Sequence, residues 1–291
     1  MSDILCIGSV LWDIIGRSPS AMRVGSDVPG RITRLPGGVA LNIAMALARF
    51  GMSPALLSAV GEDEEGDALI AACRVRGLRT DTVYRARDLP TDRYMAIEGA
   101  NGLIAAIADA HSLEAAGDKI LRPLFDGTLP QPFTGRVALD GNLRPELLAE
   151  IAGGDALAQA DLRVAPASPG KADRLLPFLQ HGHGTLYVNV EEAGPLCQTR
   201  FDHAADAAAA LTARGAARAV VTHGGAACAE ATGDDIITRT PPQVLVTRIT
   251  GAGDTFMAAH IAAEASGAGR NAALEAALDA AATYVSGETR I

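Results

Sequence analysis

Short apolar runs alternate with longer Ala-rich stretches along most of this chain. The runs end close to a polar residue or a glycine and lie at residues 4–8, 136–140, 185–190 and 218–222. Helices, several closed by a glycine suited to a left-handed C-cap, are predicted over residues 40–50, 64–76, 203–214, 253–265 and 271–285. Alternating strands and helices predict an α/β protein with a mostly parallel central sheet flanked by helices. Such sheets bind ligands beyond the carboxyl ends of their strands.

One region breaks this alternation. Two strand-like runs at residues 93–98 and 103–108 flank the loop Gly99-Ala100-Asn101-Gly102 without a helix between them, which predicts a hairpin. Residues 28–34 offer a further strand. We expect these strands to project as a small lid from a single domain spanning residues 1–291 and to cover a ligand. A plain extension of the sheet is the alternative.

The composition fits a large folded domain and limits the classes of molecule that the protein is expected to bind. Of the 291 residues, 48% are hydrophobic and only 4% aromatic, so a disordered chain is excluded and we expect a core of Ala, Leu, Val and Ile. The net charge of -9 repels a phosphate backbone, so nucleic acid is not an expected partner. A nucleotide can still bind at a helix N-terminus.

The sequence carries no pattern of export or membrane insertion. Its four cysteines are scattered, without the C-x-x-C spacing of a zinc or redox site, and we expect them to be reduced and mostly buried. The first apolar run is too short for a signal peptide, and no stretch of about eighteen apolar residues occurs. These features predict a cytoplasmic protein.

The strongest local motif is Thr250-Gly251-Ala252-Gly253-Asp254, which follows the β-rich residues 244–247 and opens a predicted helix. Glycines let the backbone turn sharply, and amides at a helix N-terminus favour an anion such as a transferring phosphoryl group. Asp254 falls in the first turn, where a carboxylate is either a helix cap or a base directed at a substrate hydroxyl. The pattern alone leaves both roles open.

A second glycine pair, Gly37-Gly38, precedes the helix predicted over residues 40–50. Asn42 is the polar residue near the start of this otherwise apolar helix, where its amide either satisfies a backbone group or hydrogen-bonds a sugar hydroxyl. Asp13 follows the first strand, at the expected carboxyl edge of the sheet. On its own, Asp13 is predicted to lie in a turn.

Together these segments resemble the ribokinase-like (PfkB) carbohydrate and nucleoside kinases over almost the whole chain. In the family's order, the segments are Asp13, Gly37-Gly38 with Asn42, Gly61-Glu62-Asp63, Asn189 to Glu192, and Gly251 to Asp254. The resemblance implies a Rossmann-like ribokinase fold with a β-strand lid, and phosphoryl transfer from ATP to a sugar or nucleoside hydroxyl. Such transfer needs alignment and charge neutralisation more than covalent chemistry from the protein.

The resemblance also implies a role for each residue. Asp254 is the expected catalytic base, and the amides of Gly251, Ala252 and Gly253 form the expected anion hole. The substrate sugar is expected at Asp13, Gly37, Gly38 and Asn42. ATP is expected at Asn189, Thr222, Gly224, Gly225 and Thr250, and Mg²⁺ is expected to be held through water by Asn189 and Glu192.

Longer stretches resemble the pseudouridine kinase branch of the family, namely residues 29–39, residues 94–98 and Ala167-Ser168-Pro169-Gly170-Lys171-Ala172. The implied reaction converts ATP and pseudouridine to ADP and pseudouridine 5′-phosphate. Thr91 and Lys171 are candidate contacts to the nucleoside, with a turn residue and a solvated helix cation as the alternatives. Competing functions are a kinase of another sugar or nucleoside, a non-catalytic sensor of the same fold, and a dinucleotide-dependent oxidoreductase. This chain lacks the G-x-G-x-x-G that a dinucleotide-dependent oxidoreductase would carry after its first strand.

The chain departs from the family pattern at Arg248, where many members have an Asp that helps to bind a monovalent cation. An Arg repels K⁺, so we expect weak or absent K⁺ activation. His181 and His183 lack a third ligand at zinc spacing, so no zinc site is expected. Relatives often dimerise through their lid strands. We expect an apolar outward face on the lid, which would suit a homodimer, formed by Met95, Ile97, Ile104 and Ala106.

Overall fold

The computed structural model describes residues 3–287. Its centre is an eight-stranded sheet in the order β14-β13-β12-β11-β10-β9-β1-β4. The strands are β1 (Ile4–Ile7), β4 (Pro54–Leu57), β9 (Arg136–Asp140), β10 (Asp161–Ala165), β11 (Thr185–Asn189), β12 (Arg218–Thr222), β13 (Cys228–Thr232) and β14 (Asp235–Arg239). Neighbours are parallel from β4 to β12 and antiparallel from β12 to β14. This confirms the predicted α/β class.

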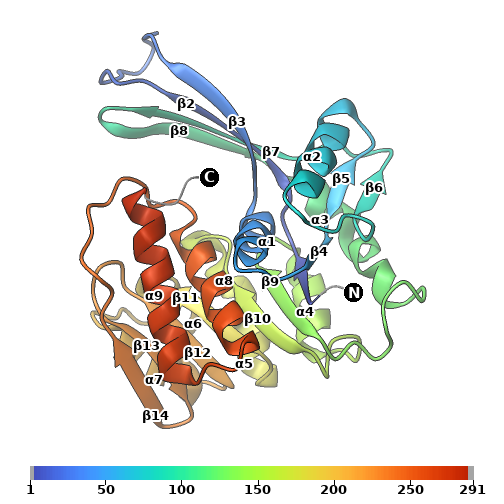
Figure 1. The fold of residues 1–291 in the computed structure, drawn as a ribbon, viewed down its shortest axis with the longest axis vertical. Coiled ribbons are helices and arrows are strands. Elements are labelled where there is room, and N and C mark those ends of the chain that lie inside the picture. Colours follow the sequence, from blue (N-terminus) through green and yellow to red (C-terminus); the bar gives the residue numbers. More distant parts are fainter. Residues whose placement is uncertain (1–2, 288–291) are drawn as a thin grey trace.

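Helices cover both faces of this sheet (Figure 1). One face carries α1 (Val39–Arg49), α2 (Glu64–Val75), α8 (Ala252–Ala265) and α9 (Arg270–Ser286). The other carries α4 (Pro145–Gly153), α5 (Leu176–His181), α6 (Val190–Cys197) and α7 (Ala204–Ala213). Because successive strand residues point to opposite faces, β1 sends Ile4 and Cys6 into the first hydrophobic layer and Leu5 and Ile7 into the second.

Most predicted elements agree with the structure to within one residue at each end. The five predicted helices are α1, α2, α7, α8 and α9, and the four predicted strands are β1, β9, β11 and β12. Smaller elements complete the chain: β5 (Ala59–Gly61), β6 (Tyr84–Ala86), α3 (Ser112–Ala116), and the 3₁₀ helices η1 (Gly117–Leu124) and η2 (Pro169–Leu175). The β-rich residues 244–247 form no strand, because they lie exposed beside the sheet and pair with no neighbouring strand within residues 3–287.

A second sheet of four strands projects from the main body (Figure 1). Its order is β3-β2-β7-β8, with β2 (Leu11–Arg17), β3 (Arg31–Gly37), β7 (Arg93–Gly99) and β8 (Gly102–Asp109), and we call it the lid. β7 and β8 occupy the predicted hairpin, and β3 lies three residues beyond the strand expected at residues 28–34. The turn predicted at Asp13 is wrong, because Asp13 lies within β2, opposite Leu35 and Tyr94.

The two faces of the lid carry different side chains. One face lines the cavity described below with Leu11, Asp13, Ile15 and Arg17 of β2 and Tyr94, Ala96 and Glu98 of β7. The opposite face exposes Ile32, Met95, Ile97 and Ile107, which are 77%, 45%, 39% and 67% accessible. Residues paired across two strands share a face, so Ala106, opposite Ala96, lies on the cavity side and not on the outward face expected for it.

The helices and cysteines agree with a folded globular body. Within residues 3–287, no helix is long and apolar enough to cross a membrane. All four cysteines are buried free thiols, as expected. Burial raises the pKa of Cys73 to about 11 and that of Cys228 to about 12, so these thiols stay protonated at neutral pH.

Candidate active site

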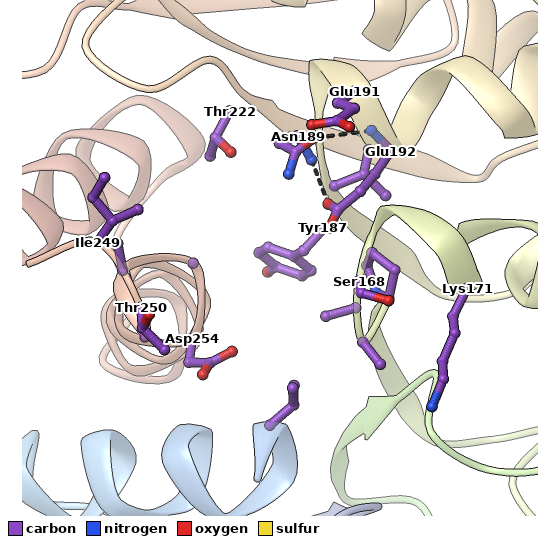
Figure 2. Close-up of a pocket in the computed structure, with 18 of the residues that line it drawn as sticks. Ser168, Lys171, Tyr187, Asn189, Glu191, Glu192, Thr222, Ile249, Thr250 and Asp254 are labelled. Carbon is purple, nitrogen blue, oxygen red and sulfur yellow. Dashed lines mark hydrogen bonds between the residues drawn. The ribbon is translucent and has the colours of Figure 1, made fainter. Parts of the chain in front are cut away.

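A cavity of about 1680 Å³ lies between the lid and the carboxyl ends of the parallel strands. Its walls come from the ends of β1, β9, β10, β11 and β12, from the first turns of α1, α6 and α8, and from the lid. Figure 2 shows side chains from several of these elements pointing into the same space. Ligands bind at this edge of an α/β sheet, because strand ends and helix N-termini converge there.

The N-terminus of α8 forms one wall of the cavity. Gly251 adopts a left-handed φ of 87°, and a Cβ there would lie 2.5 Å from the Tyr284 hydroxyl, so the turn requires glycine. The amide of Ala252 donates to the Ile249 carbonyl at 3.0 Å and is therefore not free for an anion, contrary to expectation. The amides of Gly251 and Gly253 make no hydrogen bond within residues 3–287. Two of the three expected donors remain available.

Asp254 lies in the first turn of α8 and faces the cavity. Its Oδ2 accepts a hydrogen bond from Asn42 Nδ2 at 2.9 Å. Burial raises the pKa of Asp254 to about 7; the hydrogen bond from Asn42 opposes this shift, and the negative charge of Asp140 adds to it. Gly251 is the N-cap residue and Asp254 makes no capping hydrogen bond, so the geometry favours a base over a helix cap.

The residues expected at the sugar come from β2 and from the junction of β3 with α1. Asp13 points into the cavity, and burial raises its pKa to about 6. A Cβ at Gly37 would overlap the Asp13 carboxylate, so Gly37 makes room for this side chain without lining the cavity itself. Gly38 does line the cavity, with a φ of 97° and no space for a Cβ beside the Ser9 carbonyl.

A buried polar cluster at the end of β9 is a feature that the sequence did not reveal. Asp140 is fully buried and accepts hydrogen bonds from the Ser9 amide and hydroxyl and from the Ala40 amide. Asn142 donates to Ser9 Oγ at 3.1 Å and accepts from Lys171 Nζ at 2.9 Å. Lys171 is thereby held at the cavity wall. The available signal was the polar pair Asp140 and Asn142 directly at the end of a predicted strand.

Thr91, the other candidate contact to the nucleoside, lies outside the cavity. Its residue surface is 1% exposed, and its hydroxyl and amide donate to the Asp63 carboxylate at 2.6 and 2.8 Å. Asp63 in turn caps α2 by accepting from the Gly66 amide. Through these hydrogen bonds, Thr91 holds the start of the lid hairpin against α2, and it is not part of the candidate site.

At another wall, a capping box at the start of α6 presents Asn189 and Glu192 to the cavity (Figure 2). Asn189 Oδ1 accepts from the Glu192 amide and Glu192 Oε2 accepts from the Asn189 amide, both at 2.8 Å. Burial raises the pKa of Glu192. Amide and carboxylate oxygens suit Mg²⁺, and in the described part of the chain no group of three His, Cys, Asp or Glu is placed to hold a metal. This donor set fits an Mg²⁺ ion that is held mainly by phosphates.

The residues expected at ATP lie at the end of β12 and before α8. Thr222, His223 and Gly224 line the cavity, whereas Gly225 does not. Thr250 lines it from the turn that precedes α8. Three of the four residues of the expected ATP segment, but not Gly225, therefore face the cavity.

Arg248 lies directly behind this turn. Its guanidinium stacks 3.8 Å from the centre of the Tyr284 ring, and its Nε donates to the Tyr284 carbonyl at 2.7 Å. The Tyr284 hydroxyl donates to the Thr250 carbonyl at 2.8 Å. Arg248 thus occupies the position where the family resemblance leads us to expect a carboxylate, and the weak or absent K⁺ activation expected from it stays a prediction.

Comparisons with known proteins show the family to which the chain belongs. The family model described as pfkB family carbohydrate kinase matches residues 1–289. The pseudouridine kinase of Escherichia coli (strain K12) is 31% identical over 261 residues, which cover 88% of this chain and 81% of that protein. The uncharacterized sugar kinase YeiI of the same strain is 29% identical over 261 residues, covering 87% of this chain and 69% of that protein.

A solved structure agrees with the fold. A carbohydrate kinase from Agrobacterium tumefaciens superposes with a TM-score of 0.83 at 26% identity, over 100% of this chain and 94% of that one. The family's reaction is the ATP-dependent phosphorylation of a sugar hydroxyl, for which the cavity supplies a carboxylate and a helix N-terminus. This chain belongs to the pfkB family of carbohydrate kinases and is a phosphotransferase of that kind.

Proposed function

We propose that this chain transfers the γ-phosphoryl group of ATP to the ribose 5′-hydroxyl of pseudouridine. The observation that carries the proposal is Lys171, whose ammonium group is held by Asn142 at the wall of a cavity whose lid side carries both apolar and charged side chains. The lid contributes the apolar residues Leu11, Ile15, Ala96 and Leu103 to that side, beside Asp13, Arg17 and Glu98. A uracil ring offers carbonyl oxygens to an ammonium donor and a flat apolar surface to the lid. The similarity to the pseudouridine kinase of E. coli supports the same substrate.

In the proposed reaction, Asp254 accepts the proton of the 5′-hydroxyl. The 5′-oxygen forms a bond to the γ-phosphorus while the bond from that phosphorus to the β,γ-bridging oxygen breaks, and ADP leaves. Asp13, Asn42 and the backbone at Gly38 hold the ribose hydroxyls so that the attacking oxygen stays in line. A base with a pKa of about 7 is suited to this step near neutral pH.

In the proposed complex, the N-terminus of α8 stabilises the negative charge that develops on the phosphoryl oxygens. The free amides of Gly251 and Gly253 donate to it, and the helix dipole adds a favourable potential. Thr222, Gly224, Thr250 and Asn189 flank the ATP phosphates. Mg²⁺, when bound, neutralises phosphate charge, and Asn189 and Glu192 would hold it through water.

Another sugar or nucleoside as the acceptor is the second candidate. The similarity to the sugar kinase YeiI favours it, and the cavity is large enough for either class of acceptor. Both candidates use the same base and the same anion hole, so substrate turnover is what distinguishes them. A non-catalytic sensor would need neither a base nor free amides, and both are present.

The test is ADP release from the purified protein with Mg²⁺-ATP and pseudouridine, uridine, adenosine, ribose or fructose. Uridine is the matched control, since it carries the same ribose and differs from pseudouridine in the atom that joins the base to the sugar. We expect turnover with pseudouridine and little with uridine. Faster turnover of another acceptor would assign the second candidate, and binding of nucleoside without any turnover would favour the sensor.

A further inference from the structure

Tyr187, near the end of β11, connects the cavity to the protein interior. The residue is 5% exposed and lines the cavity, and in the view of Figure 2 its ring lies between the Asn189–Glu192 capping box and Asp254. Its hydroxyl is 2.8 Å from His260 Nδ1 and 3.2 Å from the Arg163 guanidinium, neither of which lines the cavity. Tyr187 therefore places its ring at the site and its hydroxyl in the core.

His260 is fully buried on α8, where its Nε2 lies 3.3 Å from Glu230 Oε2. Arg163 can only donate, so the Tyr187 oxygen accepts from it and the hydroxyl hydrogen is left for Nδ1 of His260. The ionised Glu230 can only accept, so Nε2 carries the imidazole proton. The hydrogen bonds thus run from Arg163 through Tyr187 and His260 to Glu230.

Ion pairs hold this arrangement in place. Glu264, one turn after His260 on α8, pairs with Arg163 at 2.5 Å and with Arg218 at 2.6 Å. Glu230, which is fully buried, pairs with Arg218 at 2.8 Å and with Arg270 at 2.5 Å. We call Arg163, Tyr187, Arg218, Glu230, His260, Glu264 and Arg270 the buried cluster. It joins four strands, β10 to β13, to α8 and the start of α9.

Tyr187 and His260 each share a secondary-structure element with a residue of the candidate site. Asn189 follows Tyr187 by two residues on the same side of β11, and both line the cavity. Asp254 precedes His260 on α8 by roughly 9 Å, at about 1.5 Å of rise per residue. The Phe256 ring, which also lines the cavity, stacks on the His260 imidazole with ring centres 6.3 Å apart.

We propose that Tyr187 and His260 are positioning residues whose hydrogen bond fixes the N-terminus of α8 against the end of β11. Apolar packing would hold the helix near the sheet, but a directional hydrogen bond also sets its rotation and its position along the axis. Phosphoryl transfer depends on that precision, because a misplacement of about 1 Å costs roughly 100-fold in rate. The role applies to any acceptor, so it goes beyond the proposed substrate and depends only on the kinase activity of the family.

The test compares Tyr187→Phe with wild type, using the best acceptor of the panel above at a temperature at which both proteins are folded. The substitution keeps the ring and removes only the hydroxyl. We expect kcat to fall about tenfold or more, while the KM values for ATP and for the acceptor each stay within about threefold, since the binding side chains are untouched. His260→Leu should behave likewise. His260→Asn, which keeps an acceptor for the Tyr187 hydroxyl, should recover part of kcat.

Arg270→Gln is the matched control. It breaks an ion pair with Glu230 inside the buried cluster but leaves the Tyr187–His260 hydrogen bond intact. We expect it to lower Tm while kcat stays within about twofold of wild type. The proposal is wrong if Tyr187→Phe keeps wild-type kcat, or if Arg270→Gln loses as much kcat as Tyr187→Phe, because the cluster would then serve stability alone.

Discussion

Asn42 and Asp254, 212 residues apart in the chain, are joined by a 2.9 Å hydrogen bond from the Asn42 amide to the Asp254 carboxylate. This contact links α1, which follows the lid strand β3, to the N-terminus of α8. It orients the proposed base, and it favours the ionised carboxylate that accepts a proton. Asn42, which is proposed to hold a sugar hydroxyl, therefore also orients the Asp254 carboxylate and favours its ionised form.

Asp254→Asn should abolish most turnover without abolishing binding. The amide cannot accept the hydroxyl proton, so we expect kcat to fall by roughly 10²- to 10⁴-fold. The Kd for pseudouridine, measured by calorimetry without ATP, should stay within about threefold. Asp279→Asn, an exposed change on α9, is the control and should leave both values unchanged. Retention of a tenth or more of the wild-type kcat, on the order of 1.4 kcal/mol or less of barrier, would show that Asp254 is not the base.

The pH dependence of kcat should report the same carboxylate. Because the base must be ionised, kcat should rise with pH up to about 7, the pKa of Asp254, and level off above it. Asn42→Ala removes the hydrogen bond that lowers this pKa, so its rising limb should move to higher pH. Asp13 titrates nearby at about 6, and Asp13→Asn should move the limb to lower pH by removing a negative charge. If kcat rises over the same pH range in wild type, Asn42→Ala and Asp13→Asn, the assignment of this pKa to Asp254 is contradicted.

Lys171 and Thr91 should respond differently to substitution. Lys171→Met keeps the aliphatic stem and removes a charged donor worth about 1.5–3 kcal/mol, so KM for pseudouridine should rise roughly 10- to 100-fold while KM for ATP stays constant. Thr91→Val removes the hydrogen bond to Asp63 outside the cavity and should lower Tm by about 2–4 °C without changing either KM. A rise in nucleoside KM for Thr91→Val alone would restore Thr91 to the site.

Potassium should have little effect on turnover. The Arg248 guanidinium stacks on Tyr284 beside the turn that precedes α8, and we expect its positive charge to disfavour a monovalent cation there. We expect kcat to change by less than about twofold when KCl replaces choline chloride at constant ionic strength, with NaCl as a control for general salt effects. A large and K⁺-specific rise would mean that a cation site exists despite Arg248.

The outward face of the lid is the proposed contact between two copies of this chain. Ile32, Met95, Ile97 and Ile107 expose apolar side chains on one face of the lid, and burying them against a second copy would remove them from water. Sedimentation velocity at micromolar concentration should show a dimer, and Ile107→Asp should shift it to a monomer. Phe125→Asp, at an exposed position away from the lid, is the control. A wild-type monomer throughout this range would exclude the contact.

The contiguous parts of the site were predictable from the sequence. Gly251 to Asp254 and the Gly37-Gly38 pair each act within a single turn, so their spacing alone places them before a helix. Four strands of the main sheet, β1, β9, β11 and β12, were equally clear, because parallel strands are buried on both faces and read as continuous apolar runs. The other four, β4, β10, β13 and β14, were not predicted. β2 was missed, since Asp13 interrupts its apolar run and its partners β3 and β7 are distant in the sequence.

Contacts between distant segments account for the other differences. Thr91 has the residue type of a ligand contact, but Asp63 takes up its hydroxyl. The amide of Ala252 is a local exception, since it donates to the carbonyl of Ile249, three residues earlier, which the motif does not reveal. Tyr187 on β11 and His260 on α8 are 73 residues apart in the chain, and they form a hydrogen bond because α8 packs on the central sheet. No local pattern specifies such meetings.

The alternation of side chains along the lid strands has an evolutionary consequence. Odd-numbered residues of β2 and even-numbered residues of β7 face the cavity, and their neighbours in the sequence face away from it. A single substitution in the lid can therefore alter either what the enzyme encloses or what the enzyme adheres to, but seldom both. Selection could therefore change the substrate-facing side chains and the proposed contact between copies independently, although both are encoded in the same few strands.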